Sequence, residues 1–130
     1  MDKSNRKKVL LVDDEVDFME FARIRLEANG YNVVTASNGR EALEKLKTEK
    51  PDAVFLDILM PEINGIDVLK TIRMDDEKLP VFIITASSNE ARFGLANKLN
   101  ATGFVLKTDD LQGIINQLNE ALKIKDKHNK

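Results

Sequence analysis

Three aspartates follow short apolar runs and have the chemistry to form one charged site. The segment LLVDDE places Asp13 and Asp14 directly after Val9–Val12, and VFLDILMP places Asp57 after Ala53–Leu56. Aspartate before a helix is also a common N-cap, and aspartate after a strand often begins a turn. One such coincidence would be unremarkable, but two at adjoining strand ends favour a site.

Clustered carboxylates raise one another's pKa, so the ionised cluster needs a cation. The acids are too few to enclose calcium and lack the spacing of an EF-hand loop, whereas Mg²⁺ needs only one or two carboxylates with waters and a phosphate oxygen. Thr85 ends the apolar run VFIIT, and Lys107 follows FVL. Alone they would be a strand residue and a surface lysine, but a hydroxyl and an ammonium can both bind phosphoryl oxygens. Together these residues suggest magnesium-dependent phosphoryl chemistry.

Five short apolar runs, separated by amphipathic segments, must position these side chains. The runs lack polar alternation, which predicts strands covered on both faces. They are 9–12, 33–36, 53–56, 81–84 and 104–106. The segments between them carry apolar residues at helical spacing. These residues are Phe18, Phe21 and Ala22; Ala42, Leu43 and Leu46; Val68, Leu69 and Ile72; Leu95, Ala96 and Leu99; and Leu111, Ile114, Ile115, Leu118 and Leu122.

Repeated strand–helix units predict parallel strands with right-handed crossovers, and thus a doubly wound α/β domain. Gly30 and Asn100 are suited to left-handed helix ends, Pro51 blocks continuation of the second helix, and Gly65 begins the third. In such sheets ligands bind beyond the carboxyl ends of the strands, where the strand order reverses. If the order is 2-1-3-4-5, the first and third strands are neighbours and the three aspartates converge.

Composition restricts the partners and the compartment. The 130 residues fit one domain, with 42% apolar and 32% charged residues and a net charge of −2. This charge gives no reason to expect a nucleic-acid or membrane surface. With no cysteine, disulfides and thiolate-bound metals are excluded. The charged segment MDKSNRKK precedes an apolar run too short for a signal peptide, so we expect a cytoplasmic protein.

Four segments together resemble the receiver domain of two-component response regulators. They are VLLVDDE, DAVFLDILMPEINGIDVLKTIR, PVFIITA and ATGFVLK. The resemblance implies the flavodoxin-like (βα)5 fold of the chemotaxis regulators, a three-layer sandwich with strand order 2-1-3-4-5. It covers residues 8–123, leaving 1–7 as an N-terminal tail and 124–130 as a C-terminal tail or truncated linker.

By this resemblance, Asp57 accepts a phosphoryl group from the phosphohistidine of a sensor histidine kinase or a histidine phosphotransfer protein. The resemblance also implies the ligands of Mg²⁺. Asp14 would bind the metal directly and Asp13 chiefly through a water, while Asp57 and the backbone carbonyl of Leu59 would complete the protein ligands.

The resemblance also assigns the phosphoryl-binding and switch residues. Thr85, the amide of Ala86 and Lys107 would contact phosphoryl oxygens. Thr85 would move toward the phosphoryl group, and Phe104 would turn from a partly exposed to a buried position. A fixed core role for Phe104 is the alternative. The family usually has proline in a cis peptide after the lysine. Here Thr108 follows Lys107, which predicts a trans peptide with a re-routed loop or a costly cis bond.

The resulting prediction is a signalling switch that catalyses only its own phosphorylation and dephosphorylation. A magnesium-dependent phosphatase with an aspartyl-phosphate intermediate is the main alternative, but such enzymes typically place an acid where Leu59 stands. A flavin- or dinucleotide-binding domain lacks support, because no G-x-G-x-x-G segment follows the first strand. The effector, and whether the chain acts alone or within a larger regulator, stay open.

Overall fold

Five parallel strands form one sheet in the computed structural model, which describes residues 6–58, 64–86, 94, 96–107 and 110–128. The strand order is β2-β1-β3-β4-β5, as the resemblance implied. Every neighbouring pair is parallel. The strands are β1 (Lys8–Val12), β2 (Asn32–Ala36), β3 (Ala53–Asp57), β4 (Val81–Thr85) and β5 (Gly103–Leu106).

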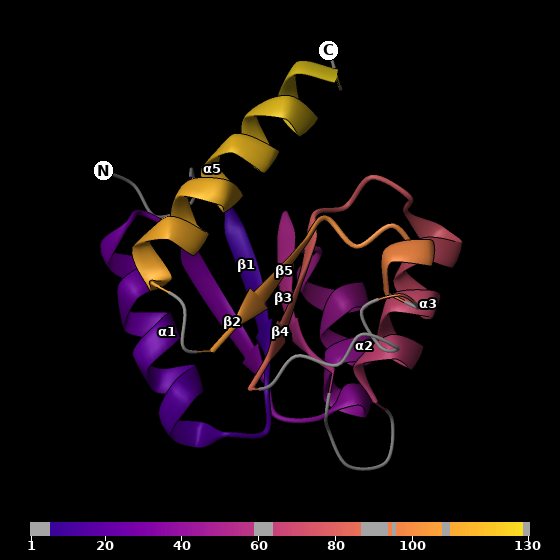
Figure 1. Cartoon of the computed structure of the whole chain (residues 1–130), viewed down its shortest axis with the longest axis horizontal. Coiled ribbons are helices and arrows are strands. Elements are labelled where there is room, and N and C mark those ends of the chain that lie inside the picture. The colour runs from indigo at the N-terminus through magenta and orange to yellow at the C-terminus, as the bar shows by residue number, and fades with distance from the viewer. Residues whose placement is uncertain (1–5, 59–63, 87–93, 95, 108–109, 129–130) are drawn as a thin grey trace.

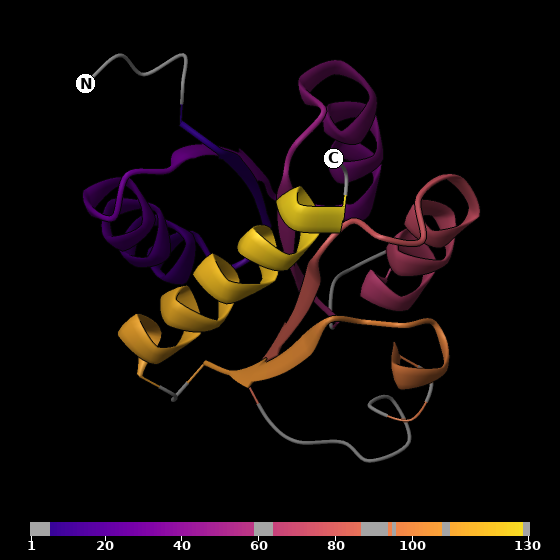
Figure 2. The same ribbon diagram turned by 90° about the horizontal axis from the view of Figure 1, so that it is seen from above.

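Helices cover both faces of the sheet. They are α1 (Val16–Ala28), α2 (Gly39–Glu49), α3 (Gly65–Asp75) and α5 (Leu111–His128). Figures 1 and 2 show α1 and α5 on one face and α2 and α3 on the other. The predicted fourth helix lies partly outside the described residues, although residues 94 and 96–98 have helical backbone. The predicted three-layer α/β sandwich is therefore confirmed. Among the described residues, every helix is too short or too polar to span a bilayer.

Two apolar clusters, one on each face of the sheet, form the core. The central strands β1, β3 and β4 are buried along almost their whole length. The edge strands β2 and β5 are less completely buried, although residues of each pack against the clusters on both faces, as predicted. The predicted stripe of α5 is buried throughout. Phe21 is 57% exposed instead, because it lies on the outer side of α1 beside the buried Ala22.

Three turns confirm the predicted helix ends. Gly30 follows α1 with φ of 93°, and Asn100 has φ of 60°, both in the left-handed region predicted from their residue types. Lys50 also adopts a left-handed conformation, with φ of 48°, between the end of α2 and Pro51. At the other end of the chain, α5 continues to His128, beyond residue 123 where we place the domain boundary.

Candidate functional site

The backbone of the sheet holds the candidate residues in place at the carboxyl ends of the strands. At three places a backbone N–H just beyond a strand, or at its end, donates to a carbonyl of the neighbouring strand. These hydrogen bonds are Asp13 N to Ala36 O (3.1 Å), Ile58 N to Ile84 O (3.3 Å) and Lys107 N to Thr85 O (2.9 Å). The sheet ladder therefore continues into the site and fixes the positions of its residues.

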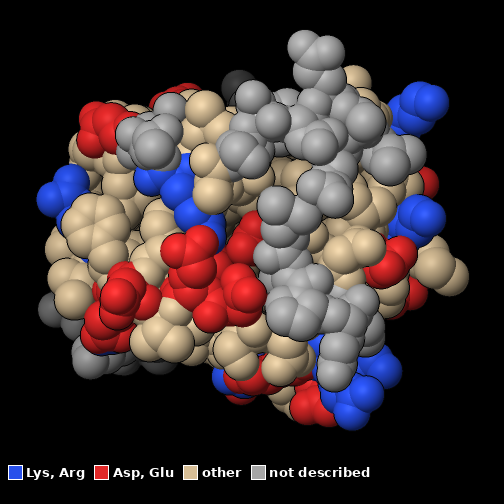
Figure 3. Space-filling view, turned by 60° about the horizontal axis from the view of Figure 1, so that its bottom comes forward, with Lys and Arg blue, Asp and Glu red and all other residues tan. Residues whose placement is uncertain are grey.

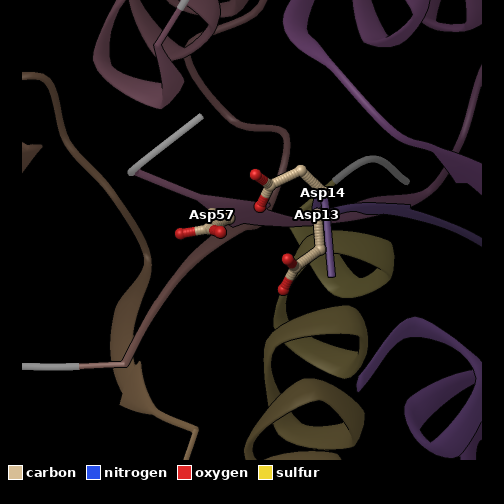
Figure 4. Close-up of side chains that lie close together, drawn as sticks. All are labelled: Asp13, Asp14 and Asp57. Atoms are coloured by element: carbon tan, nitrogen blue, oxygen red, sulfur yellow. The ribbon is translucent and has the colours of Figure 1, made fainter. Parts of the chain in front are cut away.

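The register of the sheet brings the three aspartates together. Val12 of β1 pairs with Leu56 of β3, so the next position along places Asp13 opposite Asp57. Carboxylate oxygens of Asp13, Asp14 and Asp57 lie within 4.8 Å of one another, and Figure 4 shows the three side chains converging from neighbouring strand ends. The predicted convergence is confirmed.

The alternative role of Asp14 as a helix cap is wrong. Glu15 occupies the N-cap position of α1, and no side chain caps this end of the helix. Asp13 instead makes the local contact, because its Oδ1 accepts a hydrogen bond from Glu15 N at 2.8 Å. Asp14 stays exposed beside the buried Asp13 and Asp57. One acid of the site is thus open to solvent while the other two are enclosed.

Glycine is required where α3 meets the strand that carries Asp57. Gly65 N donates to Ile58 O at 3.0 Å. A Cβ atom on Gly65 would lie 2.2 Å from Asp57 O and 2.7 Å from Ile58 Cα. Both obstacles are backbone atoms that no rotamer change can remove. Glycine therefore lets the first turn of α3 pack directly on the end of β3.

Lys107 is the cation of the site. Its Nζ lies 2.9 Å from Asp13 Oδ2, 3.6 Å from Asp57 Oδ2 and 2.5 Å from Glu15 Oε1. The Phe18 ring lies 5.0 Å from the same atom, within the range of a cation–π contact. Burial alone would lower the pKa of Lys107. Hydrogen bonds to Glu15 and Asp13, and the charges of Asp13 and Asp57, outweigh burial and hold the pKa well above its ordinary value.

The residues present fit a divalent metal ion of the magnesium type. Asp13 Oδ2 is buried and has no hydrogen-bond partner among the described residues, although Lys107 Nζ approaches it. Among the described residues, the four carboxylates of Asp13, Asp14, Glu15 and Asp57 gather around one ammonium, that of Lys107, so three negative charges stay uncompensated. Figure 3 shows acidic side chains gathered beside a basic one on this side of the molecule. Hard cations with oxygen ligands are suited to such a cluster.

The other described residues with a predicted phosphoryl-binding or switch role are Thr85, Ala86 and Phe104. Thr85 is the buried last residue of β4, and the exposed Ala86 comes next. Phe104 of β5 pairs with Ile83, which lies two residues before Thr85. Because side chains alternate along a strand, Phe104 and Thr85 share one face of the sheet. Phe104 is partly buried against the cluster on that face. Leu59 and Thr108 lie outside the described residues, so their predicted roles are untested.

Sequence reasoning missed Glu15 and Phe18. Both lie at the beginning of α1, three residues apart, so they project from the same side of the helix toward Lys107. The third acid of LLVDDE was a visible signal for Glu15. Its partner was not visible, because Lys107 is 92 residues away in the chain.

Comparison with known proteins agrees with this geometry. The family model described as the response regulator receiver domain matches residues 9–119. The alkaline phosphatase synthesis transcriptional regulatory protein PhoP of Bacillus subtilis is 41% identical over 101 residues, which are 78% of this chain and 42% of PhoP. The chemotaxis protein CheY of Thermotoga maritima is 37% identical over 118 residues, which are 90% of this chain and 98% of CheY. This chain therefore spans less than half the length of PhoP.

Solved receiver structures share the fold. A response regulator receiver domain from Clostridium thermocellum superposes with a TM-score of 0.86 at 29% identity, covering 92% of this chain and 97% of that one. A CheY-like receiver domain protein from Methanospirillum hungatei gives a TM-score of 0.91, covering 95% and 99%. Its 21% identity supports a likeness of fold alone.

Proposed function

Because this chain belongs to the response regulator receiver family, we propose that Asp57 accepts a phosphoryl group in a reaction that requires Mg²⁺. The single observation that carries the proposal is the buried Asp57 carboxylate, which lies 3.6 Å from Lys107 Nζ and within 4.8 Å of Asp13 and Asp14. The donor is a phosphohistidine of a sensor histidine kinase or a histidine phosphotransfer protein. Receiver domains act as signalling switches, and a switch is the role we propose for this chain.

In the proposed transfer, an oxygen of Asp57 attacks the phosphorus, the new O–P bond forms and the N–P bond to the donor histidine breaks. Lys107 can donate to a phosphoryl oxygen on Asp57, because its Nζ already lies 3.6 Å from the carboxylate. Mg²⁺, when bound through Asp14, Asp13, Asp57 and the carbonyl of Leu59, would supply charge neutralisation for the transferred group.

The proposed conformational response to phosphorylation involves Thr85 and Phe104, whose side chains share one face of the sheet. The Thr85 hydroxyl and the Ala86 N–H would donate to phosphoryl oxygens at the end of β4. Thr85 would then be drawn toward the phosphoryl group, and Phe104 on the same face would fill the space that it leaves. The partial burial of Phe104 supports this proposal, because the switch requires a ring that is not yet fully buried in the unphosphorylated chain.

Membership of the receiver family does not determine the output of the switch. PhoP is named as a transcriptional regulatory protein and CheY as a chemotaxis protein, although both contain a matching receiver segment. We therefore propose only phosphorylation-dependent switching for residues 8–123, with direct nucleic-acid binding and effector action left to a further domain or a separate partner.

The test is phosphorylation by acetyl phosphate, followed by intact-mass spectrometry. Wild-type protein with Mg²⁺ should gain one phosphoryl group, and chelation of the metal should abolish the gain. Asp57→Asn should stay unmodified. Asp67→Asn is the matched control, because Asp67 is an exposed acid in the first turn of α3. Equal labelling of Asp57→Asn would contradict the proposal. Continuous turnover of a phosphomonoester would favour the phosphatase alternative.

A further inference from the structure

Glu15 makes the shortest contact to Lys107 in the site. Its Oε1 lies 2.5 Å from Nζ, against 2.9 Å for Asp13 Oδ2 and 3.6 Å for Asp57 Oδ2. Nothing in the proposed transfer uses this carboxylate. Because Glu15 lies closer to Lys107 Nζ than Asp57 does, we expect it to affect how readily Lys107 can bind a phosphoryl oxygen.

Two of the three donors of Lys107 form hydrogen bonds, to Asp13 and Glu15, while Asp57 Oδ2 lies 3.6 Å away. A lysine ammonium has three N–H donors and no acceptor. Three carboxylates surround it here, and the Phe18 ring covers part of the remaining space. A phosphoryl oxygen on Asp57 therefore competes with Glu15 and Asp13 for a close contact with Lys107.

Burial decides which acceptor can withdraw at least cost. Asp13 is fully buried and is held by the backbone N–H of Glu15 at 2.8 Å. Asp57 carries the phosphoryl group itself. The side chain of Glu15 is 58% exposed, and Lys107 is its only side-chain partner among the described residues. When Glu15 leaves, water can solvate its carboxylate, whereas a buried Asp13 would lose its counter-charge.

We propose that Glu15 is a positioning residue that holds Lys107 in the unphosphorylated protein and gives it up to a phosphoryl oxygen when Asp57 is modified. This inference rests on the proposed function. Glu15 thus opposes modification in two ways: it occupies the lysine donor, and its negative charge repels the incoming phosphoryl group. Removing the carboxylate should favour the phosphorylated form.

Three variants separate the contact from the charge. Glu15→Gln keeps the length of the side chain and removes the charge. Glu15→Asp keeps the charge but is one methylene shorter, which weakens its reach to Lys107. Asp17→Asn is the matched control, because Asp17 is an exposed acid in the same helical turn. Beryllium trifluoride with saturating Mg²⁺ is the probe, since it mimics a phosphoryl group without chemical turnover.

Affinity for the probe is measured by fluorine NMR titration. Glu15→Gln and Glu15→Asp should each bind roughly two- to fivefold more tightly than wild type, the size expected for release of a partly exposed ion pair. Asp17→Asn should bind as wild type does. The ammonium resonance of Lys107 should shift without any ligand in both Glu15 variants and stay unchanged in Asp17→Asn.

The outcomes that contradict the inference differ from the one that contradicts the proposed function. Unchanged or weaker binding by Glu15→Gln overturns the inference while leaving the proposed function intact. Wild-type affinity in Glu15→Asp, together with tighter binding by Asp17→Asn, means that only the general charge matters and also overturns it. Failure of wild-type protein to bind the probe at Asp57 overturns the proposed function, and the inference with it.

Discussion

Replacing Gly65 by alanine should destabilise the protein at the point where α3 meets β3, the strand that ends in Asp57. The new Cβ would lie 2.2 Å from Asp57 O, whereas ordinary contacts begin at 3.4 Å. The start of α3 must therefore move away by about 1 Å, since the obstacle is backbone. That movement breaks the hydrogen bond from Gly65 N to Ile58 O and loosens the buried Ile66 and Val68.

The lost hydrogen bond and the strained packing lower the free energy of unfolding by different amounts. Loss of the hydrogen bond costs about 1 kcal/mol, and strain with disturbed packing adds about 1–3 kcal/mol. The free energy of unfolding should therefore fall by about 2–4 kcal/mol, a large part of the ~5–15 kcal/mol of a typical domain. Urea unfolding followed by far-UV circular dichroism measures the change.

Gly113→Ala provides the matched control. Gly113 lies in α5, and a Cβ atom there would meet nothing within 4 Å. Because alanine is the better helix former, this variant should gain about 0.5–1 kcal/mol. The two Gly→Ala changes should thus differ in sign. If Gly65→Ala is as stable as wild type, the close backbone approach does not constrain the site and the reasoning is refuted.

Three further predictions concern charge. Lys107→Met should lower the unfolding free energy by about 2–3 kcal/mol in metal-free buffer, because the buried Asp13 loses its counter-charge, and Mg²⁺ should restore part of the loss in thermal melts. Since the pKa of Lys107 is raised above 10.5, the wild-type contribution should stay constant below pH 10.5 and fall only as the pH rises through the folded-state pKa. Asp14→Ala should weaken Mg²⁺ binding in calorimetry with little loss of stability, because Asp14 is exposed. Asp13→Ala should unfold at a lower urea concentration, because Asp13 is buried and paired with Lys107. Equal stability of the two variants would contradict this. Burial raises the pKa of Tyr31 above its ordinary 10.0, so stability should decrease as the pH rises from 10 through the folded-state pKa. Ultraviolet titration of this single tyrosine, repeated in urea, measures the difference, and identical curves would refute it.

Much of the fold could be predicted because its strands are apolar on both faces. The predicted runs 53–56 and 81–84 differ from β3 and β4 by one residue each. Those extra residues are Asp57 and Thr85, which are polar in side chain but still paired through their backbone. The strand order came from the resemblance, because periodicity alone does not determine which strands are neighbours.

Other features could not be predicted, because exposure at the sheet edge and contacts between distant residues depend on how the elements pack in three dimensions. Partial exposure of β2 follows from its position at the sheet edge, which its apolar composition does not reveal. Phe21 fits a helical stripe as well as Ala22 does, but only the packing of α1 shows which one faces the core. The contact between Glu15 and Lys107 joins residues 92 positions apart and depends on where the beginning of α1 packs against the sheet.

Because β5 is the last strand in the chain, Lys107 is the last of the described charged residues of the site to be synthesised. Asp13, Asp14 and Asp57 all leave the ribosome well before Lys107, which lies 94 residues after Asp13. Domains tend to form from the N-terminus as translation proceeds. A nascent chain ending before β5 would contain Asp57, the proposed phosphoryl acceptor, and the acidic cluster without the ammonium that lies beside them. If Asp57 accepts a phosphoryl group as proposed, this ability should appear late and abruptly, when the last strand pairs with β4, so that unfinished chains do not compete with finished ones for the phosphoryl donor.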